Sequence, residues 1–128
     1  MTWIAIATGG ALGSVARHGV NVLMSRVVHR PVPYATAAVN LVGCVAIGCV
    51  AIGMLAGLLA SNRLHMTAQV RAFVFVGVLG GFTTFSSFGL DTFALGREGS
   101  YAVAFWNVAA QVGLGLLGVA AGFRVGAA

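Results

Sequence analysis

Residues 80–88 read GGFTTFSSF, a run of glycines and hydroxyl residues inside an otherwise apolar segment. Glycine is a poor helix former, and serine and threonine hydroxyls compete for backbone hydrogen bonds. The stretch therefore predicts a helix that breaks near its centre. Within a membrane, unpaired backbone carbonyls are tolerated only where they line a cavity or bind an ion, and free carbonyls favour a hard cation.

Phe85 and Phe88 follow the predicted break at positions i and i+3, so both rings lie on one face of a helix. The edge of a phenyl ring carries the positive part of its quadrupole. Rings turned edge-on can therefore contact a small anion that their faces would repel. The alternative is ordinary aromatic packing in a core.

Polar residues within the other apolar segments are further candidates. Asn40 lies one turn after Thr36, and its amide can either donate hydrogen bonds to an anion or bridge two helices. Arg17 either reaches the membrane interface or lines a vestibule that concentrates anions. Asn107 and Gln111 repeat the i, i+4 spacing near the C-terminus, where they either bond across helices or form a polar track.

The composition around these residues is that of a membrane protein. Of the 128 residues, 59% are hydrophobic and only 7% are charged, whereas a soluble domain carries about 25% charged residues. The net charge of +5 reflects a scarcity of acids, because Asp91 and Glu98 are the only two. Cys44 and Cys49 lie in an apolar run, and we interpret them as small hydrophobic side chains.

Four apolar stretches are long enough to cross a bilayer, whose core of about 30 Å requires about 20 helical residues. They cover about residues 2–24, 34–60, 72–95 and 101–123, and the connections between them are short. The sequence therefore predicts one all-α integral membrane domain over residues 1–128, with four transmembrane helices of which the third is broken.

Arginines are divided evenly between the two sides of such a bundle, and lysine is absent. The side with the termini holds Arg63, Arg71 and Arg124, and the opposite side holds Arg26, Arg30 and Arg97. Because the Lys/Arg bias of short loops sets orientation, two interpretations stay open. Either one weakly determined orientation is helped by a partner, or the chain inserts both ways and pairs head-to-tail with itself.

Glycines spaced by four residues favour close packing of helices, within or between subunits. Gly9/Gly13, Gly53/Gly57 and Gly118/Gly122 are pairs of this kind.

The chain resembles the Fluc/CrcB family of fluoride channels over essentially its whole length. The residues that carry the resemblance are GGALGSVAR (9–17), TAAVNLVGC (36–44) and above all GGFTTFSSF (80–88). The resemblance implies a passive channel, not an enzyme, that exports fluoride and so relieves its cytoplasmic toxicity. It also implies an antiparallel, dual-topology homodimer in the inner (plasma) membrane.

The resemblance further implies roles for particular residues. The backbone oxygens of Gly80 and Thr83 would hold a structural sodium ion at the dimer centre. Arg17 matches the arginine that ends the family's first motif. The fluoride pathway would include Asn40, Phe85, Phe88, Thr36 and Ser87.

Three positions depart from the family pattern, the first being Ala35, where the family commonly has glycine. Asn107 stands where many members carry a tyrosine, and Gln111 stands where a serine is common, so their place on a fourth-helix polar track is open. Two alternatives to a channel also remain. A small dual-topology multidrug antiporter needs a membrane-embedded carboxylate, and the first span has none. A non-transporting scaffold subunit leaves Asn40 and the broken helix without a purpose.

Overall fold

The computed structural model describes residues 1–27, 43 and 49–128. Thr36, Asn40, Arg30 and Cys44, which the sequence singled out, lie outside the described residues. Within the described residues the regular structure is entirely helical. Its elements are α1 (Thr2–Val27), α3 (Val50–Ala60), α4 (Ala68–Arg71), the π-helix η2 (Ala72–Leu79), α5 (Gly80–Phe82), α6 (Phe85–Arg97) and α7 (Tyr101–Ala127).

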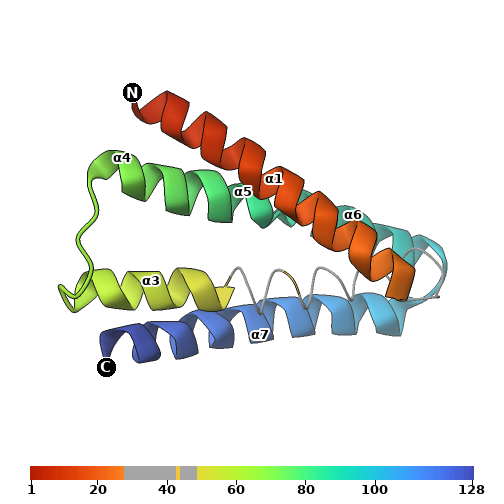
Figure 1. Cartoon of the computed structure of the whole chain (residues 1–128). Coiled ribbons are helices and arrows are strands. Elements are labelled where there is room, and N and C mark those ends of the chain that lie inside the picture. The colour runs from red at the N-terminus through yellow and green to blue at the C-terminus, as the bar shows by residue number, and fades with distance from the viewer. Residues whose placement is uncertain (28–42, 44–48) are drawn as a thin grey trace.

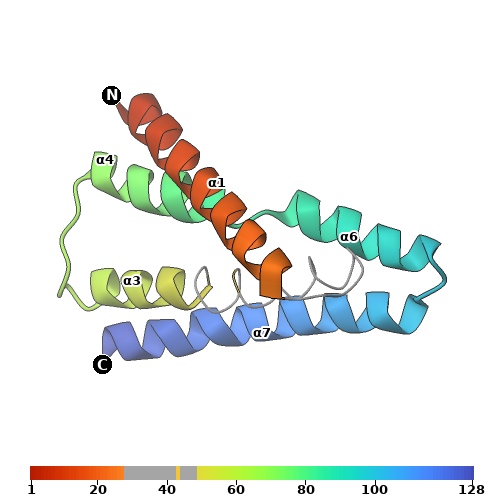
Figure 2. The same cartoon turned by 45° about the vertical axis from the view of Figure 1, so that its right-hand side comes forward.

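The helices form two pairs, and within each pair the two helices run in the same general direction along the chain (Figure 1). α1 crosses η2 and α5 on one side of the molecule, and α3 runs beside the C-terminal half of α7 on the other. Figure 2 shows the same arrangement after a rotation, with α6 passing along the N-terminal half of α7. The N- and C-termini lie at the same end of the molecule.

Glycines allow the backbones of the first pair to touch. A Cβ atom at Gly9 would lie 2.6 Å from the carbonyl oxygen of Phe73, and one at Gly13 would lie 2.8 Å from the backbone nitrogen of Phe82. Any larger residue at these positions would push α1 away from η2 and α5. The close helix packing predicted from Gly9 and Gly13 is therefore present in this pair.

The second pair is built in the same way. Gly53 and Gly57 of α3 face the backbone of α7, so the close packing predicted from these two glycines is present. On α7, Cβ atoms at Gly122 and Gly126 would meet the α3 backbone. The close packing predicted for Gly122 is therefore present, the one predicted for Gly118 stays a prediction, and the spacing of four residues continues to Gly126.

The third helical segment begins at Ala68, four residues earlier than the sequence predicted. Gln69 and Arg71 are polar, so the sequence placed them in the connecting loop. The helix starts there because Thr67 is extended and its hydroxyl oxygen accepts a hydrogen bond from the Val70 N–H at 3.3 Å. This is the capping that threonine commonly supplies at a helix start.

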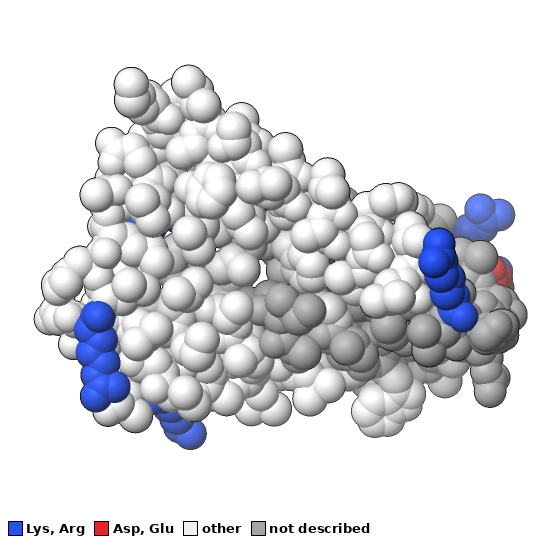
Figure 3. Space-filling view, in the orientation of Figure 1, with Lys and Arg blue, Asp and Glu red and all other residues white. Residues whose placement is uncertain are grey.

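Two of the described helical segments are long and apolar enough to cross a membrane, Ala68–Arg97 and Tyr101–Ala127. α1 has 26 residues and is also long enough, but it carries Arg17 and His18 in its interior. Many large apolar side chains are exposed, and Figure 3 shows the charged side chains at the two ends with uncharged surface between them. Such a surface suits contact with lipid or with another chain.

Candidate functional site

The helical path is interrupted inside the GGFTTFSSF run, at Thr83 and Thr84. Thr83 (φ −89°, ψ 140°) and Thr84 (φ −143°, ψ 123°) are both extended, and α6 begins with Phe85. Gly80, by contrast, keeps helical angles of φ −66° and ψ −37°. The two threonines, rather than the glycines, therefore carry the interruption.

Gly81 has a different role from the one its sequence context suggested. A Cβ atom at this position would lie 2.7 Å from the carbonyl oxygen of Gly10 on α1. The hydroxyl of Ser14, also on α1, donates to the Gly81 carbonyl oxygen at 3.4 Å. Gly81 thus lets α1 approach the helix just before the interruption, which fixes where the extended residues lie.

The interruption leaves backbone oxygens without helical partners. The Thr83 N–H and the Thr83 hydroxyl both donate to the Leu79 carbonyl oxygen at 3.0 Å. The next carbonyl, that of Gly80, would need the Thr84 N–H, which has left the helical path, and a helix end leaves its last carbonyls unpaired. The Thr83 carbonyl lies beyond the helix end in extended backbone. These two oxygens have the chemistry that a hard cation prefers.

A cavity of about 280 Å³ lies beside the interruption. We call it the phenylalanine cavity, and the described residues that line it are Cys49, Ile52, Thr83, Thr84, Phe85, Phe88, Gln111 and Val112. It joins the broken segment to α3 and α7. Three side chains that the sequence analysis named, Phe85, Phe88 and Gln111, therefore meet in one place.

The two phenylalanines stand together at this cavity. Their ring centroids are 5.2 Å apart and their planes are inclined by 48°. Phe85 is 80% exposed in the single chain, whereas Phe82, one turn earlier, is only 8% exposed. Phe82 is therefore a core residue, and Phe85 has no comparable packing of its own within one chain.

A series of hydrogen bonds runs from Gln111, on the α7 side of this cavity, through Asn107 to Thr92 on α6. The Gln111 side-chain nitrogen Nε2 donates to Asn107 Oδ1 at 2.8 Å, and Asn107 Nδ2 donates to the Thr92 hydroxyl at 2.9 Å. The Thr92 hydroxyl donates to the Phe88 carbonyl oxygen at 2.8 Å. Asn107 and Gln111 thus bond to each other and across to α6, the interhelical role that the sequence left open. The sequence analysis missed Thr92.

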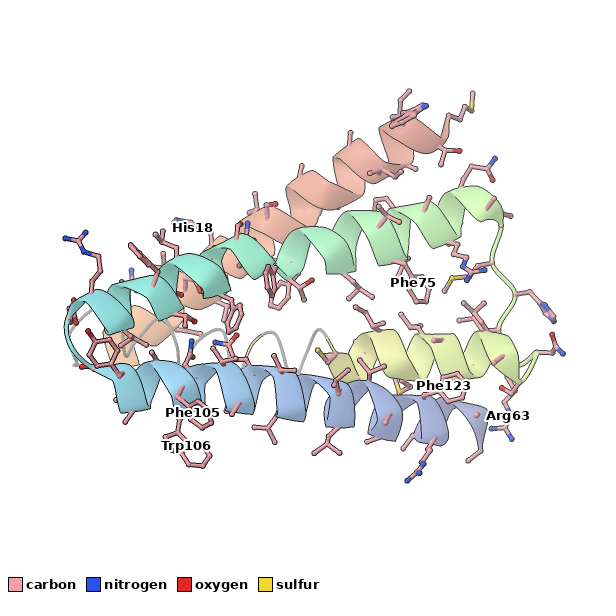
Figure 4. The ribbon with its side chains drawn as sticks, turned by 180° about the vertical axis from the view of Figure 1, so that it is seen from behind. His18, Arg63, Phe75, Phe105, Trp106 and Phe123 are labelled. Atoms are coloured by element: carbon pink, nitrogen blue, oxygen red, sulfur yellow. The ribbon has the colours of Figure 1, made fainter. Side chains whose placement is uncertain are left out.

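A second cavity, of about 310 Å³, lies between α1 and α6. We call it the arginine cavity, and the described residues that line it are Ser14, Arg17, His18, Asn21, Ser87, Leu90 and Asp91. Figure 4 marks His18 near the place where α1 passes α6. Arg17 and Ser87, predicted from separate motifs, therefore lie at the same cavity.

The sequence contained a signal for the arginine cavity that the sequence analysis did not use. Asn21 follows Arg17 by four residues and Asp91 follows Ser87 by four, so each pair shares a helix face. The side-chain oxygen of Asn21 is buried and accepts no hydrogen bond from the described residues. The cavity wall thus combines an arginine with hydroxyl, amide and carboxyl groups.

Comparisons with known proteins agree with the motifs. Residues 4–123 match the family described as "CrcB-like protein, Camphor Resistance (CrcB)". A relative from Paracoccus denitrificans is 46% identical over 98% of this chain and 94% of its own length. Relatives from Methylobacterium radiotolerans and Agrobacterium fabrum are 44% and 40% identical, over 98% and 94% of this chain and 85% and 92% of their own lengths. All three are named "Fluoride-specific ion channel FluC". The chain therefore belongs to the CrcB family.

Proposed function

We propose that this protein is a passive, fluoride-selective ion channel that lets fluoride leave the cell and so relieves its toxicity. The observation that carries the proposal is the phenylalanine cavity, where Phe85 and Phe88 stand beside an interrupted helix. The names of the relatives support fluoride as the ion. They do not favour the antiporter or the scaffold subunit.

The chemistry of the cavity suits a small anion. Phenyl ring edges are electropositive, and the Gln111 amide and the Thr83 and Thr84 residues stand at the same cavity. Asn40 and Thr36 belong to the proposed pathway on the strength of the family motif, and Ser87 lies at the arginine cavity with Arg17. Arg17 would draw anions toward the protein from bulk water.

A homodimer is part of the proposal, because one chain does not enclose the pathway. Phe85 is 80% exposed in the single chain. A ring that binds an ion in a bilayer has to be sheltered from lipid, and a second copy would supply that shelter. The basic side chains at both ends of the molecule support insertion in both orientations, so the two copies would be antiparallel in the inner membrane.

A structural sodium ion fits the interrupted helix. The carbonyl oxygens of Gly80 and Thr83 are the proposed ligands, and Gly80 lies on the surface of the single chain. Hard cations are held by several oxygen ligands at once, so two oxygens from one chain are too few. A second copy would contribute its own pair, and the ion would then hold the two interrupted helices together by its charge.

Fluoride efflux from liposomes tests this function. Purified protein in liposomes loaded with potassium fluoride should release fluoride when potassium is allowed to move, and liposomes loaded with chloride should retain chloride. A matched pair of samples prepared in sodium or in a large organic cation tests the metal separately, since loss of sodium should reduce flux or dimer yield. Equal release of fluoride from protein-free liposomes would refute the channel.

A further inference from the structure

Both the nitrogen and the oxygen of the Asn107 amide are hydrogen-bonded within the protein. Its nitrogen donates to Thr92, its oxygen accepts from Gln111, and only 9% of the residue is exposed. An amide used in this way has one N–H left and little access to solvent. Asn107 is therefore poorly placed to contact a passing ion, although it lies in the helix where the polar track was expected.

The series from Gln111 to Phe88 ends on the turn that carries a cavity phenylalanine. Thr92 Oγ1 accepts from α7 and donates to the Phe88 carbonyl oxygen one turn earlier on α6. This places a fixed connection between α7 and the backbone that carries the Phe88 ring. Gln111, at the other end of the series, stands at the same cavity as Phe88.

The start of α6 is not capped by a side chain. Thr84, the residue before the helix, makes no capping hydrogen bond, and its hydroxyl pairs instead with the Ser86 hydroxyl at 2.9 Å. The first turn of α6, which holds Phe85 and Phe88, follows two extended residues. The tie from Thr92 to α7 therefore adds a fixed point to a turn that its own N-cap does not hold.

We infer that Thr92 and Asn107 are positioning residues, which hold the Phe88 turn against α7 and thereby set the geometry of the phenylalanine cavity. Gln111 anchors the series at the cavity wall. The inference deepens the proposed function, since the cavity is the one through which fluoride is proposed to pass. The inference itself concerns the position of the Phe88 side chain, which can be measured without any ion flux.

Two threonines in the chain allow a matched test. Thr92 and Thr8 both donate their hydroxyl to the carbonyl oxygen four residues earlier, at 2.8 and 2.9 Å. Only Thr92 also accepts a hydrogen bond from another helix. Thr92→Val and Thr8→Val therefore remove the same local bond, and only the first also breaks the series. Thr92→Ser keeps the hydroxyl and should restore the parent behaviour.

The experiment combines fluorine NMR with flux. The eight phenylalanines are replaced by 4-fluorophenylalanine, and the Phe82 and Phe88 signals are assigned from single Phe→Leu variants. Without added fluoride, Thr92→Val and Asn107→Leu should shift or broaden the Phe88 signal and leave the Phe82 signal unchanged. In liposomes the same two variants should slow fluoride efflux about tenfold, whereas Thr92→Ser and Thr8→Val should stay within about twofold.

Each outcome decides something different. A Phe88 signal that does not respond to Thr92→Val or Asn107→Leu would overturn the inference. So would failure of both variants to fold while Thr8→Val folds, because the series would then serve folding alone. A parent protein that carries no fluoride, but whose Phe88 signal responds as expected, would leave the positioning role standing and refute the proposed function.

Discussion

The two glycine-packed helix pairs and the seam between α6 and α7 are built differently. In the pairs, backbone meets backbone at Gly9, Gly53 and Gly126, and no side chain separates the helices at those points. At the seam, polar side chains from both helices meet, and the buried Asn107 bonds to Thr92. The comparison indicates that the glycine contacts form the scaffold, while α6, which contributes to the walls of both cavities, carries the residues of the proposed fluoride pathway.

The largest effect on stability is expected in the scaffold. A Cβ atom at Gly53 would lie 2.9 Å from the Phe123 backbone nitrogen and would also meet the Val119 carbonyl oxygen. Gly53→Ala should therefore lower the free energy of unfolding by about 1–3 kcal/mol, the usual cost of overpacking. Thermal unfolding of the purified protein, followed by circular dichroism, measures this loss.

Gly113→Ala is the control for that substitution. Gly113 lies on α7 as the partner glycines do, but a Cβ atom there would have no described atom within 4 Å. It should unfold at the parent temperature or slightly above. Equal losses at Gly53 and Gly113 would contradict the assignment of the glycine contacts as scaffold.

A smaller effect, on flux rather than on stability, is expected at the arginine cavity. Arg17→Gln should slow fluoride efflux about threefold to tenfold at low ionic strength, because one attracting charge is lost. The deficit should shrink at high salt, where charges are screened. Arg17→Lys keeps the charge and should stay close to the parent. A deficit that is independent of salt would show that Arg17 acts by packing instead of by charge.

The smallest effect is expected for a hydrogen bond within a glycine-packed pair. The Ser61 hydroxyl donates to the Gly126 carbonyl oxygen at 3.3 Å, next to the contact of α3 with α7. Ser61→Ala should cost less than about 1 kcal/mol of stability and should leave fluoride efflux unchanged. The efflux of Ser61→Ala should be measured beside that of Thr92→Val, since both variants remove a hydroxyl that bonds to a backbone carbonyl. Equal loss of flux from the two variants would contradict the distinction between the glycine-packed pairs and the seam of α6 with α7.

The long apolar runs predicted the helices that the structure describes, while most of the second predicted span lies outside the described residues. An apolar run in a membrane has to pair its own backbone N–H and C=O groups with each other, and it therefore becomes helical. The last of these helices, α7, begins at Tyr101, as the hydropathy indicated. The interruption at Thr83 and Thr84 falls within the stretch singled out for its composition. The sequence attributed the loss of helix to the glycines and the hydroxyl residues together. The extended residues are the two threonines, whereas Gly81 accommodates the backbone of Gly10. Such contact between distant residues cannot be inferred from local propensity.

The candidate site, too, was predictable only in part, because some of its contacts join residues that are far apart in the sequence. Phe85 and Phe88 were singled out because they follow the predicted break, and Gln111 because it is a polar residue four positions after Asn107 in an apolar segment. Thr92 was missed because a threonine inside a helix is unremarkable until its partner Asn107 is known. The contact of Gly126 with α3, which extends the contact predicted for Gly122, is likewise a property of the packed structure.

The central claim is that Phe85 and Phe88 contact the ion while Phe82 packs in the core. Fluoride efflux and dimer yield should be measured side by side for Phe82→Leu, Phe85→Leu and Phe88→Leu. Leucine fills much of the space of a phenyl ring but has no electropositive edge. The account predicts that the Phe85 and Phe88 variants form dimers at the parent yield and lose most of their flux, whereas Phe82→Leu conducts and loses only about 1.5 kcal/mol of stability or less. Parent-like flux from all three variants would contradict it.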